Sequence, residues 1–219
     1  VGVSGGKDSR TLLDLLVRGV DIPGDYDVVA IHVDGSAVGL PDQAPRMVDW
    51  FQTLGVNYDI PPLMVPDDEP LPMDCFRCAW NRRKTLFFAA DRLRCNKVAF
   101  GHHADDAAVT TLMSLMYKGQ LESLEPRLSF FDGHFIVIRP MIYLSEREIE
   151  RYARVCGWTF PPELVCAREE DARRVHFERF LATFSPTERE QIRANLWNVV
   201  QEEGQGPASK EDAAREALT

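Results

Sequence analysis

Six consecutive residues near the start of the chain have side chains and backbone suited to phosphate chemistry: Ser4, Gly5, Gly6, Lys7, Asp8 and Ser9. Two adjacent glycines let the backbone turn at positive φ and bring consecutive N–H groups close to a ligand. The residues after Ser9 are apolar at helical spacing, so we expect a helix N-terminus to add unpaired donors and a positive dipole end. Lys7 adds a positive charge. Such a concave loop fits a phosphate or pyrophosphate group.

Asp8 distinguishes this loop from a Walker A loop. A Walker A loop needs Gly where Val1 stands and Ser or Thr where Asp8 stands. A carboxylate in an anion-binding loop repels phosphate unless it binds Mg²⁺ or accepts hydrogen bonds from backbone donors. We expect Asp8 to bind Mg²⁺, and an ordinary glycine turn that caps a helix is the alternative interpretation.

The complete hexapeptide resembles the signature of the PP-loop ATP pyrophosphatases, which cleave ATP between its α and β phosphates. The resemblance implies that Lys7 and Asp8 are catalytic. It also implies that the ATP phosphates bind along the loop, on Ser4, Gly5, Gly6, Lys7, Asp8 and Ser9.

The cysteines form a second candidate centre. Cys75 and Cys78 are three residues apart at the start of an expected helix, where the dipole favours thiolates. A Cys-x-x-Cys pair can be a metal or cluster ligand, a redox pair or an accident of spacing. A thioredoxin-like pair would follow the first strand of its fold, and a structural zinc normally needs four protein ligands. Cys95 and Cys156 fit buried hydrophobes, whereas Cys166 follows a Pro-Pro loop.

A third group of polar residues follows a predicted strand over residues 97–101. The segment reads Gly101-His102-His103-Ala104-Asp105-Asp106. The histidines could be a hydrogen-bonded strand end, and the acids could be an N-cap and first-turn residue of the next helix. Both interpretations leave these side chains facing a ligand at the same edge of the sheet.

Three segments together resemble the tRNA 2-thiocytidine synthetase family over about residues 1–200. They are the hexapeptide, Gly-His-His-x-Asp-Asp at 101–106 and Ile-Val-Ile-Arg-Pro at 136–140. The resemblance implies a 4Fe-4S cluster held by Cys75, Cys78 and Cys166, with one iron open to sulfur and the first two cysteines catalytic. It also implies contacts to ATP from Asp34, Gly101, His102, Asp105 and Asp106.

The elements that must position these residues alternate between strand and helix. This order predicts an α/β fold with a doubly wound parallel sheet, whose ligands bind at the C-terminal ends of the strands. We expect the third strand at an edge because of Pro61 and Pro62. The capping-box pattern of Ser145 and Glu148 predicts another helix start. Five strands are predicted, over residues 1–3, 26–34, 58–65, 97–101 and 135–138.

The predicted domain organisation has three parts. Residues 1–143 form the PP-loop ATP-binding domain with the Cys-x-x-Cys helix inserted, and a helix over 75–94 is expected there. Residues 144–200 form a helical segment carrying Cys166, with helices over 169–183 and 186–200. The polar residues 201–219 are predicted to be disordered.

Composition limits the classes of partner. The net charge of −9 argues against a generally basic nucleic-acid-coating surface, although residues 74–97 carry seven basic and two acidic side chains, a local balance of +5. No apolar run reaches membrane-spanning length and no signal peptide is visible, so no membrane is expected. Five cysteines without secretory features predict a reducing cytoplasm. Because the loop begins at once, we expect further chain before Val1.

The leading hypothesis is an ATP-dependent sulfur transferase that adenylates a nucleobase carbonyl, a cytidine of tRNA, and replaces its oxygen by sulfur. Cofactors would be ATP, Mg²⁺ and the 4Fe-4S cluster. Expected partners are tRNA, a sulfur donor (a cysteine desulfurase or free sulfide) and a second copy of the chain in a homodimer. Two alternatives remain at this point: a PP-loop sulfur transferase or desulfurase acting on a small metabolite, and a nucleotide-binding metal or redox sensor.

Overall fold

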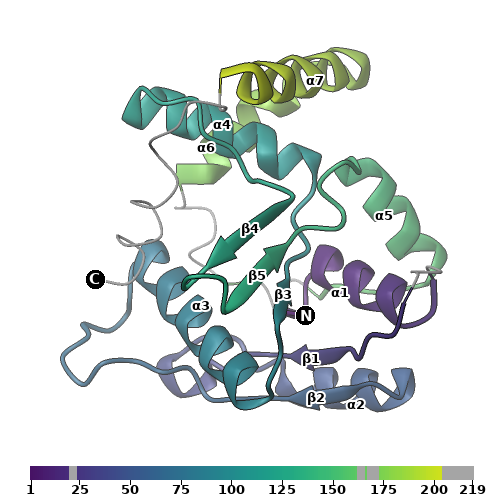
Figure 1. Cartoon of the computed structure of the whole chain (residues 1–219), viewed down its shortest axis with the longest axis vertical. Coiled ribbons are helices and arrows are strands. Elements are labelled where there is room, and N and C mark those ends of the chain that lie inside the picture. The colour runs from purple at the N-terminus through teal and green to yellow at the C-terminus, as the bar shows by residue number, and fades with distance from the viewer. Residues whose placement is uncertain (20–23, 162–165, 167–172, 204–219) are drawn as a thin grey trace.

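The computed structural model describes residues 1–19, 24–161, 166 and 173–203. Its strands form a twisted sheet flanked by helices (Figure 1). The strands are β1 (Val29–Ile31), β2 (Asn57–Asp59), β3 (Lys97–Ala99), β4 (Arg127–Phe130) and β5 (Phe135–Ile138). The helices are α1 (Lys7–Asp14), α2 (Ala44–Leu54), α3 (Cys75–Arg92), α4 (Ala104–Lys118), α5 (Glu146–Val155), α6 (Arg173–Ala182) and α7 (Pro186–Glu203).

Residues 1–3 join the two halves of the sheet. β1 pairs in parallel with β2, and β5 lies between the parallel β3 and the antiparallel β4. The Val3 N–H donates to the Ile31 carbonyl at 2.8 Å, and the Gly2 N–H donates to the Ala99 carbonyl at 3.1 Å. The resulting order is β2, β1, residues 1–3, β3, β5 and β4, which places the phosphate loop at the centre of the sheet.

The α/β prediction is confirmed, whereas a wholly parallel sheet is wrong. β4 is antiparallel because only four residues separate it from β5, and a parallel partner needs a long crossover. The predicted count of five parallel strands is not reproduced. Four strands, β1, β2, β3 and β5, lie in parallel pairs, and residues 1–3 add only a single bridge. The edge position predicted for the third strand is confirmed, because β2 pairs only with β1 among the described strands.

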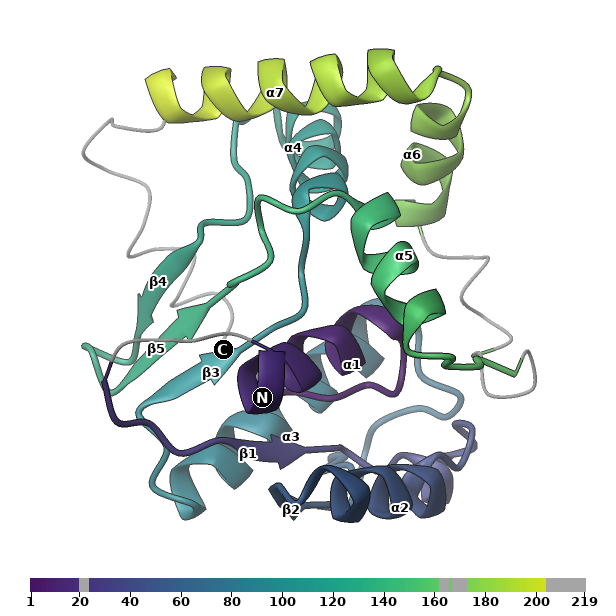
Figure 2. The same ribbon diagram turned by 90° about the vertical axis from the view of Figure 1, so that its right-hand side faces the viewer.

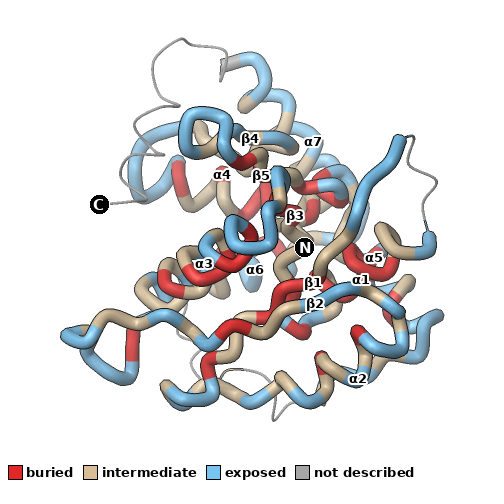
Figure 3. Tube along the Cα trace, turned by 60° about the horizontal axis from the view of Figure 1, so that its bottom comes forward, coloured by how far each residue is buried: buried red, intermediate tan, exposed pale blue. Residues whose placement is uncertain are grey.

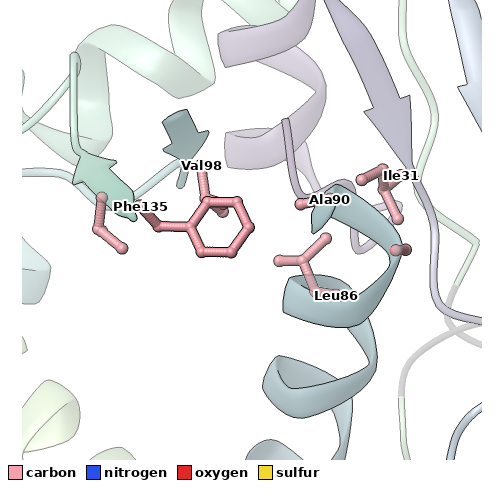
Figure 4. Close-up of a cluster of buried hydrophobic side chains, with 7 residues drawn as sticks. Ile31, Leu86, Ala90, Val98 and Phe135 are labelled. Atoms are coloured by element: carbon pink, nitrogen blue, oxygen red, sulfur yellow. The ribbon is translucent and has the colours of Figure 1, made fainter. Parts of the chain in front are cut away.

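Alternate residues of the strands pack on opposite faces of the sheet. Figure 4 shows Leu86 and Ala90 of α3 against Ile31, Val98 and Phe135 on one face. Their neighbours in the strands face the other way: Ala30 packs with α1 and α2, and Ala99 packs with α1 and α5. Buried residues therefore follow β1 and the inner side of α3 in Figure 3. Helices cover both faces, as a doubly wound fold requires.

The C-terminal helices pack mainly on α4. Phe177 and Leu181 of α6 bury against Ala108 and Val109, with α7 beside them (Figure 2). α5 instead packs on α1 through Ile149, and its predicted capping box is present. The domain boundaries at 143 and 200 stay predictions. No helix in the described ranges is long and apolar enough to cross a membrane.

Two end positions need correction or fall outside the structure. α7 continues to Glu203, three residues into the predicted disordered tail, because Gln201, Glu202 and Glu203 are good helix formers. The rest of that tail, 204–219, lies outside the described residues, as do residues 169–172 of the predicted helix over 169–183.

Candidate functional site

The phosphate loop is closed by its own hydroxyls. The Ser4 N–H donates to the Ser9 Oγ at 3.1 Å, and that hydroxyl in turn donates to the Gly6 carbonyl at 3.2 Å. Gly5 has a φ of +93°, and a Cβ there would fall 2.0 Å from the Gln43 Oε1. The predicted glycine turn at a helix start is confirmed, and α1 begins inside the hexapeptide at Lys7.

Gly101 fixes the loop against the end of β3. A Cβ on Gly101 would lie 2.8 Å from the carbonyl carbon of Asp8 and 2.9 Å from the Ser9 nitrogen. Only a glycine lets the two backbones approach so closely. This contact brings the hexapeptide together with the segment 101–106, as the strand order predicts.

Asp8 has an oxygen suited to a cation. Its Oδ1 is buried and makes no hydrogen bond within the described residues. It lies 3.3 Å from the Lys7 Nζ and 3.8 Å from the His103 Nε2. A buried carboxylate oxygen without a hydrogen bond, beside a phosphate loop, fits a divalent cation with oxygen ligands.

His102 is a neutral hydrogen-bond donor. Burial lowers its pKa to about 3, and the charges of Arg139 and Arg174 act in the same direction. The Arg139 Nε donates to the His102 Nδ1 at 3.3 Å, so the ring carries its proton on Nε2. The ring can therefore donate to an oxygen without adding charge.

Both aspartates of the segment lie in the first turn of α4, so the predicted first-turn acid is confirmed, whereas the predicted aspartate N-cap is wrong because His103 is the N-cap. The Asp106 carboxylate accepts from the His103 N–H at 2.8 Å and pairs with Arg174 of α6. Burial raises the pKa of Asp106 in spite of these partners. Asp105 accepts from the Arg193 Nη1 of α7 at 2.7 Å.

Glu146 at the start of α5 completes this network. Its N–H donates to the Asp105 Oδ2 at 2.8 Å, and its carboxylate accepts from the Lys7 Nζ at 2.8 Å. Burial opposes the charge of Lys7, but Asp8 and Glu146 outweigh it and raise the pKa of Lys7 above its ordinary value. Glu146 is not among the site residues predicted from the sequence. The only sequence signal near Glu146 is the capping box beside it.

Asp8, Gly101, His102 and Asp106 line a cavity of about 470 Å³, whereas Lys7 and Glu146 lie outside its lining. The loop, the end of β3 and α3 provide most of its wall, and Arg174 reaches in from α6. Arg82 and Arg83 of α3 were also missed as site residues, although the basic run after the cysteines was visible. The polar and charged residues of the wall are Ser4, Asp8, Ser9, Arg82, Arg83, His102, Asp106 and Arg174.

Asp34 has a different local role. Its side chain accepts from the Ser36 N–H at 2.9 Å and from the Ser36 hydroxyl at 3.1 Å. Within the described residues, Ile31 and Val33 line the cavity but Asp34 does not. Its predicted contact to the base of ATP stays a prediction.

The Cys-x-x-Cys pair begins the helix that passes the cavity. Cys75 is exposed and Cys78 half-buried, and Asp74 caps the helix by accepting from the Arg77 N–H at 2.7 Å. Ala79, directly after Cys78, lines the cavity. The pair therefore lies about one helical turn from the cavity.

Thiolates are suitable ligands for an iron–sulfur cluster. Cys166, the third predicted ligand, is half-buried. The described ranges contain no group of three or more His, Cys, Asp or Glu side chains arranged around a metal ion. The three-thiolate set stays a prediction. Cys156 is exposed at the C-cap of α5, so its interpretation as a buried hydrophobe is wrong, whereas Cys95 packs against the core.

The comparisons with a family model and with individual proteins agree with one another. A family model described as a PP-loop domain matches residues 1–162. The chain is 36% identical over 205 residues to a tRNA-cytidine(32) 2-sulfurtransferase of Anaeromyxobacter dehalogenans (strain 2CP-C), covering 90% of this chain and 69% of the relative. It is 33% identical over 212 residues to a protein of the same name from Azoarcus sp. (strain BH72), covering 91% and 68%.

Among solved structures, the U34-tRNA thiolase NcsA from Methanococcus maripaludis with its 4Fe-4S cluster superimposes with a TM-score of 0.69. The alignment covers 91% of this chain and 70% of that one at 22% identity. The likeness shows a shared fold.

Proposed function

This chain belongs to the PP-loop family that includes the tRNA-cytidine(32) 2-sulfurtransferases, and we propose that it is an ATP-dependent tRNA sulfurtransferase. Its substrate would be a cytidine carbonyl, whose oxygen is first adenylated and then replaced by sulfur. The single observation that carries the proposal is the pairing of Lys7 and Asp8 on the first turn of α1, at a glycine loop that opens on a cavity of about 470 Å³.

The residues of the loop and of the cavity support cleavage at the α-phosphate. Lys7 would stabilise negative charge as the carbonyl oxygen attacks the α-phosphorus and pyrophosphate leaves. Asp8, through its buried Oδ1, would hold the Mg²⁺ that neutralises the phosphates. His102 would donate a hydrogen bond from its Nε2–H to a phosphate oxygen. Arg82 and Arg83 would balance the remaining charge.

Sulfur transfer requires groups beside the adenylated base. Cys75, Cys78 and Cys166 would hold a 4Fe-4S cluster, which would supply an open iron for the incoming sulfur. The sulfur would come from a cysteine desulfurase or from free sulfide, and AMP would leave with the oxygen. We propose further that the active unit is a cytoplasmic homodimer.

The test is reconstitution with the full chain, purified without oxygen. The protein is incubated with ATP, Mg²⁺, sulfide and unmodified tRNA, and the nucleosides are analysed by mass spectrometry. We expect thiocytidine in tRNA together with pyrophosphate. Pyrophosphate release at a rate that tRNA does not change would favour a small-molecule substrate. The absence of any pyrophosphate release would favour a sensor.

The ligand set is tested separately by iron and sulfide analysis. We expect Cys75→Ala and Cys166→Ala to lose cluster iron. Cys156→Ala is the matched control, because this exposed cysteine is outside the predicted set. Iron retained in Cys166→Ala would overturn the assignment.

A further inference from the structure

A second, larger cleft is lined by α5, α7 and the N-terminal half of α4. Figure 2 shows the course of these three helices. Its volume is about 1170 Å³. Asp105 lines this cleft and Asp106 lines the loop cavity, so adjacent residues separate the two spaces. Glu146 also lines the cleft and holds Lys7. A molecule bound in the cleft would therefore lie next to the side chains that contact the phosphate loop.

Arginines line both walls of the cleft. Arg147, Arg151 and Arg154 follow helical spacing along α5 and are exposed. Arg189 and Arg193 face them from α7. The Arg189 Nε is buried and makes no hydrogen bond within the described part of the chain. A buried donor without an acceptor indicates a place for an oxygen of a ligand.

Acids share the cleft but are partly occupied. Glu146 is paired with Lys7 at 2.8 Å, and Asp105 is paired with Arg193 at 2.7 Å. Glu148 is held in the capping box of α5. Glu150 and Glu190 also line the cleft, so its five arginines face five acids and the lining carries no net charge. Within this lining the Arg189 Nε is the buried guanidinium nitrogen without an acceptor.

An aromatic pair joins the two walls of the cleft, with Tyr143 just before α5 and Trp197 on α7. Tyr143 is 69% exposed, and its ring centroid lies 5.4 Å from that of Trp197 in an edge-on arrangement. Both side chains line the cleft. Arginines beside exposed aromatic rings are the combination that binds unpaired nucleotides, because the rings stack on bases and the guanidinium groups contact phosphates. A double helix offers no free base face for such rings.

We propose that the cleft between α5 and α7 binds unpaired nucleotides of the substrate RNA, with Trp197 and Tyr143 stacking on a base and Arg151, Arg154 and Arg189 contacting phosphates. This inference rests on the proposed function and adds the place at which the RNA reaches the phosphate loop.

The test measures RNA affinity of the full chain by fluorescence anisotropy. The probe is a labelled RNA hairpin with a cytidine-containing unpaired loop, and the control probe is the same stem as a blunt duplex. We expect Trp197→Ala to bind the hairpin about tenfold more weakly, with the duplex unaffected. Trp197→Phe keeps an aromatic ring and should retain most of the affinity. Arg151→Ala should lower the salt dependence by about one phosphate contact.

Lys97→Ala is the matched control, because Lys97 is an exposed cation at the opposite, N-terminal end of β3. Wild-type binding of the hairpin with unchanged affinity in Trp197→Ala and Arg151→Ala would overturn the cleft assignment and leave the proposed function standing. No binding of RNA by the wild type would instead overturn both. If Trp197→Ala does not fold, by circular dichroism, Arg151→Ala and Trp197→Phe decide.

Discussion

The phosphate loop and the C-terminal helices meet at the first turn of α4, but through different kinds of contact. The loop is held by backbone packing, in which Gly101 lies against Asp8 and Ser9, and by the Ser9 hydroxyl inside the loop itself. The helices are joined to it by long charged side chains, with Glu146 on Lys7, Arg174 on Asp106 and Arg193 on Asp105.

This difference shows which part of the site is preformed. A loop held by backbone packing keeps its conformation when the ligand changes. A guanidinium group, in contrast, can exchange a carboxylate partner for a phosphate without any movement of its helix. The family match ends at residue 162, before Arg174 and Arg193, so these arginines lie beyond the matched domain. The comparison therefore predicts large effects on chemistry from the loop and smaller effects on stability and affinity from the helices.

Lys7→Ala should give the largest effect. Pyrophosphate release should fall about a hundredfold, because the charge that stabilises the transition state at the α-phosphate is lost. The measurement is the initial rate of pyrophosphate formation with saturating ATP. Lys118→Ala is the control, since Lys118 pairs with Glu122 at the exposed end of α4. Equal rates in the two variants would contradict a catalytic Lys7.

Gly101→Ala tests the packing of the loop. Its Cβ would meet the Asp8 and Ser9 backbone at under 3.0 Å, so we expect a loss of about 1–3 kcal/mol in unfolding free energy. Chemical denaturation followed by circular dichroism measures it. Gly6→Ala is the control, because its Cβ would lie 3.6 Å from the Ser4 Oγ, an ordinary contact. A Gly101→Ala protein as stable as Gly6→Ala would show that the loop is not fixed by this contact.

Arg174→Ala tests the attachment of the helices. It leaves the Asp106 carboxylate without its cation, and we expect a loss of about 1–2 kcal/mol, reduced from a fully buried value because the Arg174 side chain is 36% exposed. Asp106→Asn in the same protein should recover part of the loss. Arg92→Ala removes a more exposed pair with Asp59 and should cost less. A larger loss in Arg92→Ala would reverse the comparison.

Local patterns explain what could be predicted from sequence. The loop, the α5 capping box, the edge position of β2 and the start of α3 at Cys75 each depend on a few neighbouring residues. β4 could not be predicted, because its strand character depends on pairing with β5. At Asp34 the structure shows only local hydrogen bonds from Ser36, and the predicted contact to ATP stays a prediction.

The missed site residues share one physical reason. Glu146 lies 139 residues from its partner Lys7, and Arg174 lies 68 residues from its partner Asp106. Charged side chains that are expected to be exposed at helix starts occur in most proteins. Nothing in their neighbouring sequence distinguishes a charge that reaches into a site from one that faces water. Only the packing of α5 on α1 and of α6 on α4 brings them there.

The smallest expected effect, and the one that joins the two regions, is the pH dependence due to His102. Its pKa is about 3 in the folded chain against an ordinary value of 6.5. Between these values the unfolded chain binds a proton that the folded chain does not, so the free energy of unfolding should fall as the pH drops below 6.5. We expect His102→Asn to flatten this fall by about 1 kcal/mol near pH 6.

The same histidine reports on the helices. Because the Arg174 charge helps to lower the pKa of His102, Arg174→Ala should move that pKa upward, which an NMR titration of the ring measures directly. An unmoved pKa of His102 in Arg174→Ala would show that burial and the other neighbouring charges, Arg139 among them, set it without Arg174. The C-terminal helices would then influence the loop only through Lys7 and Asp106.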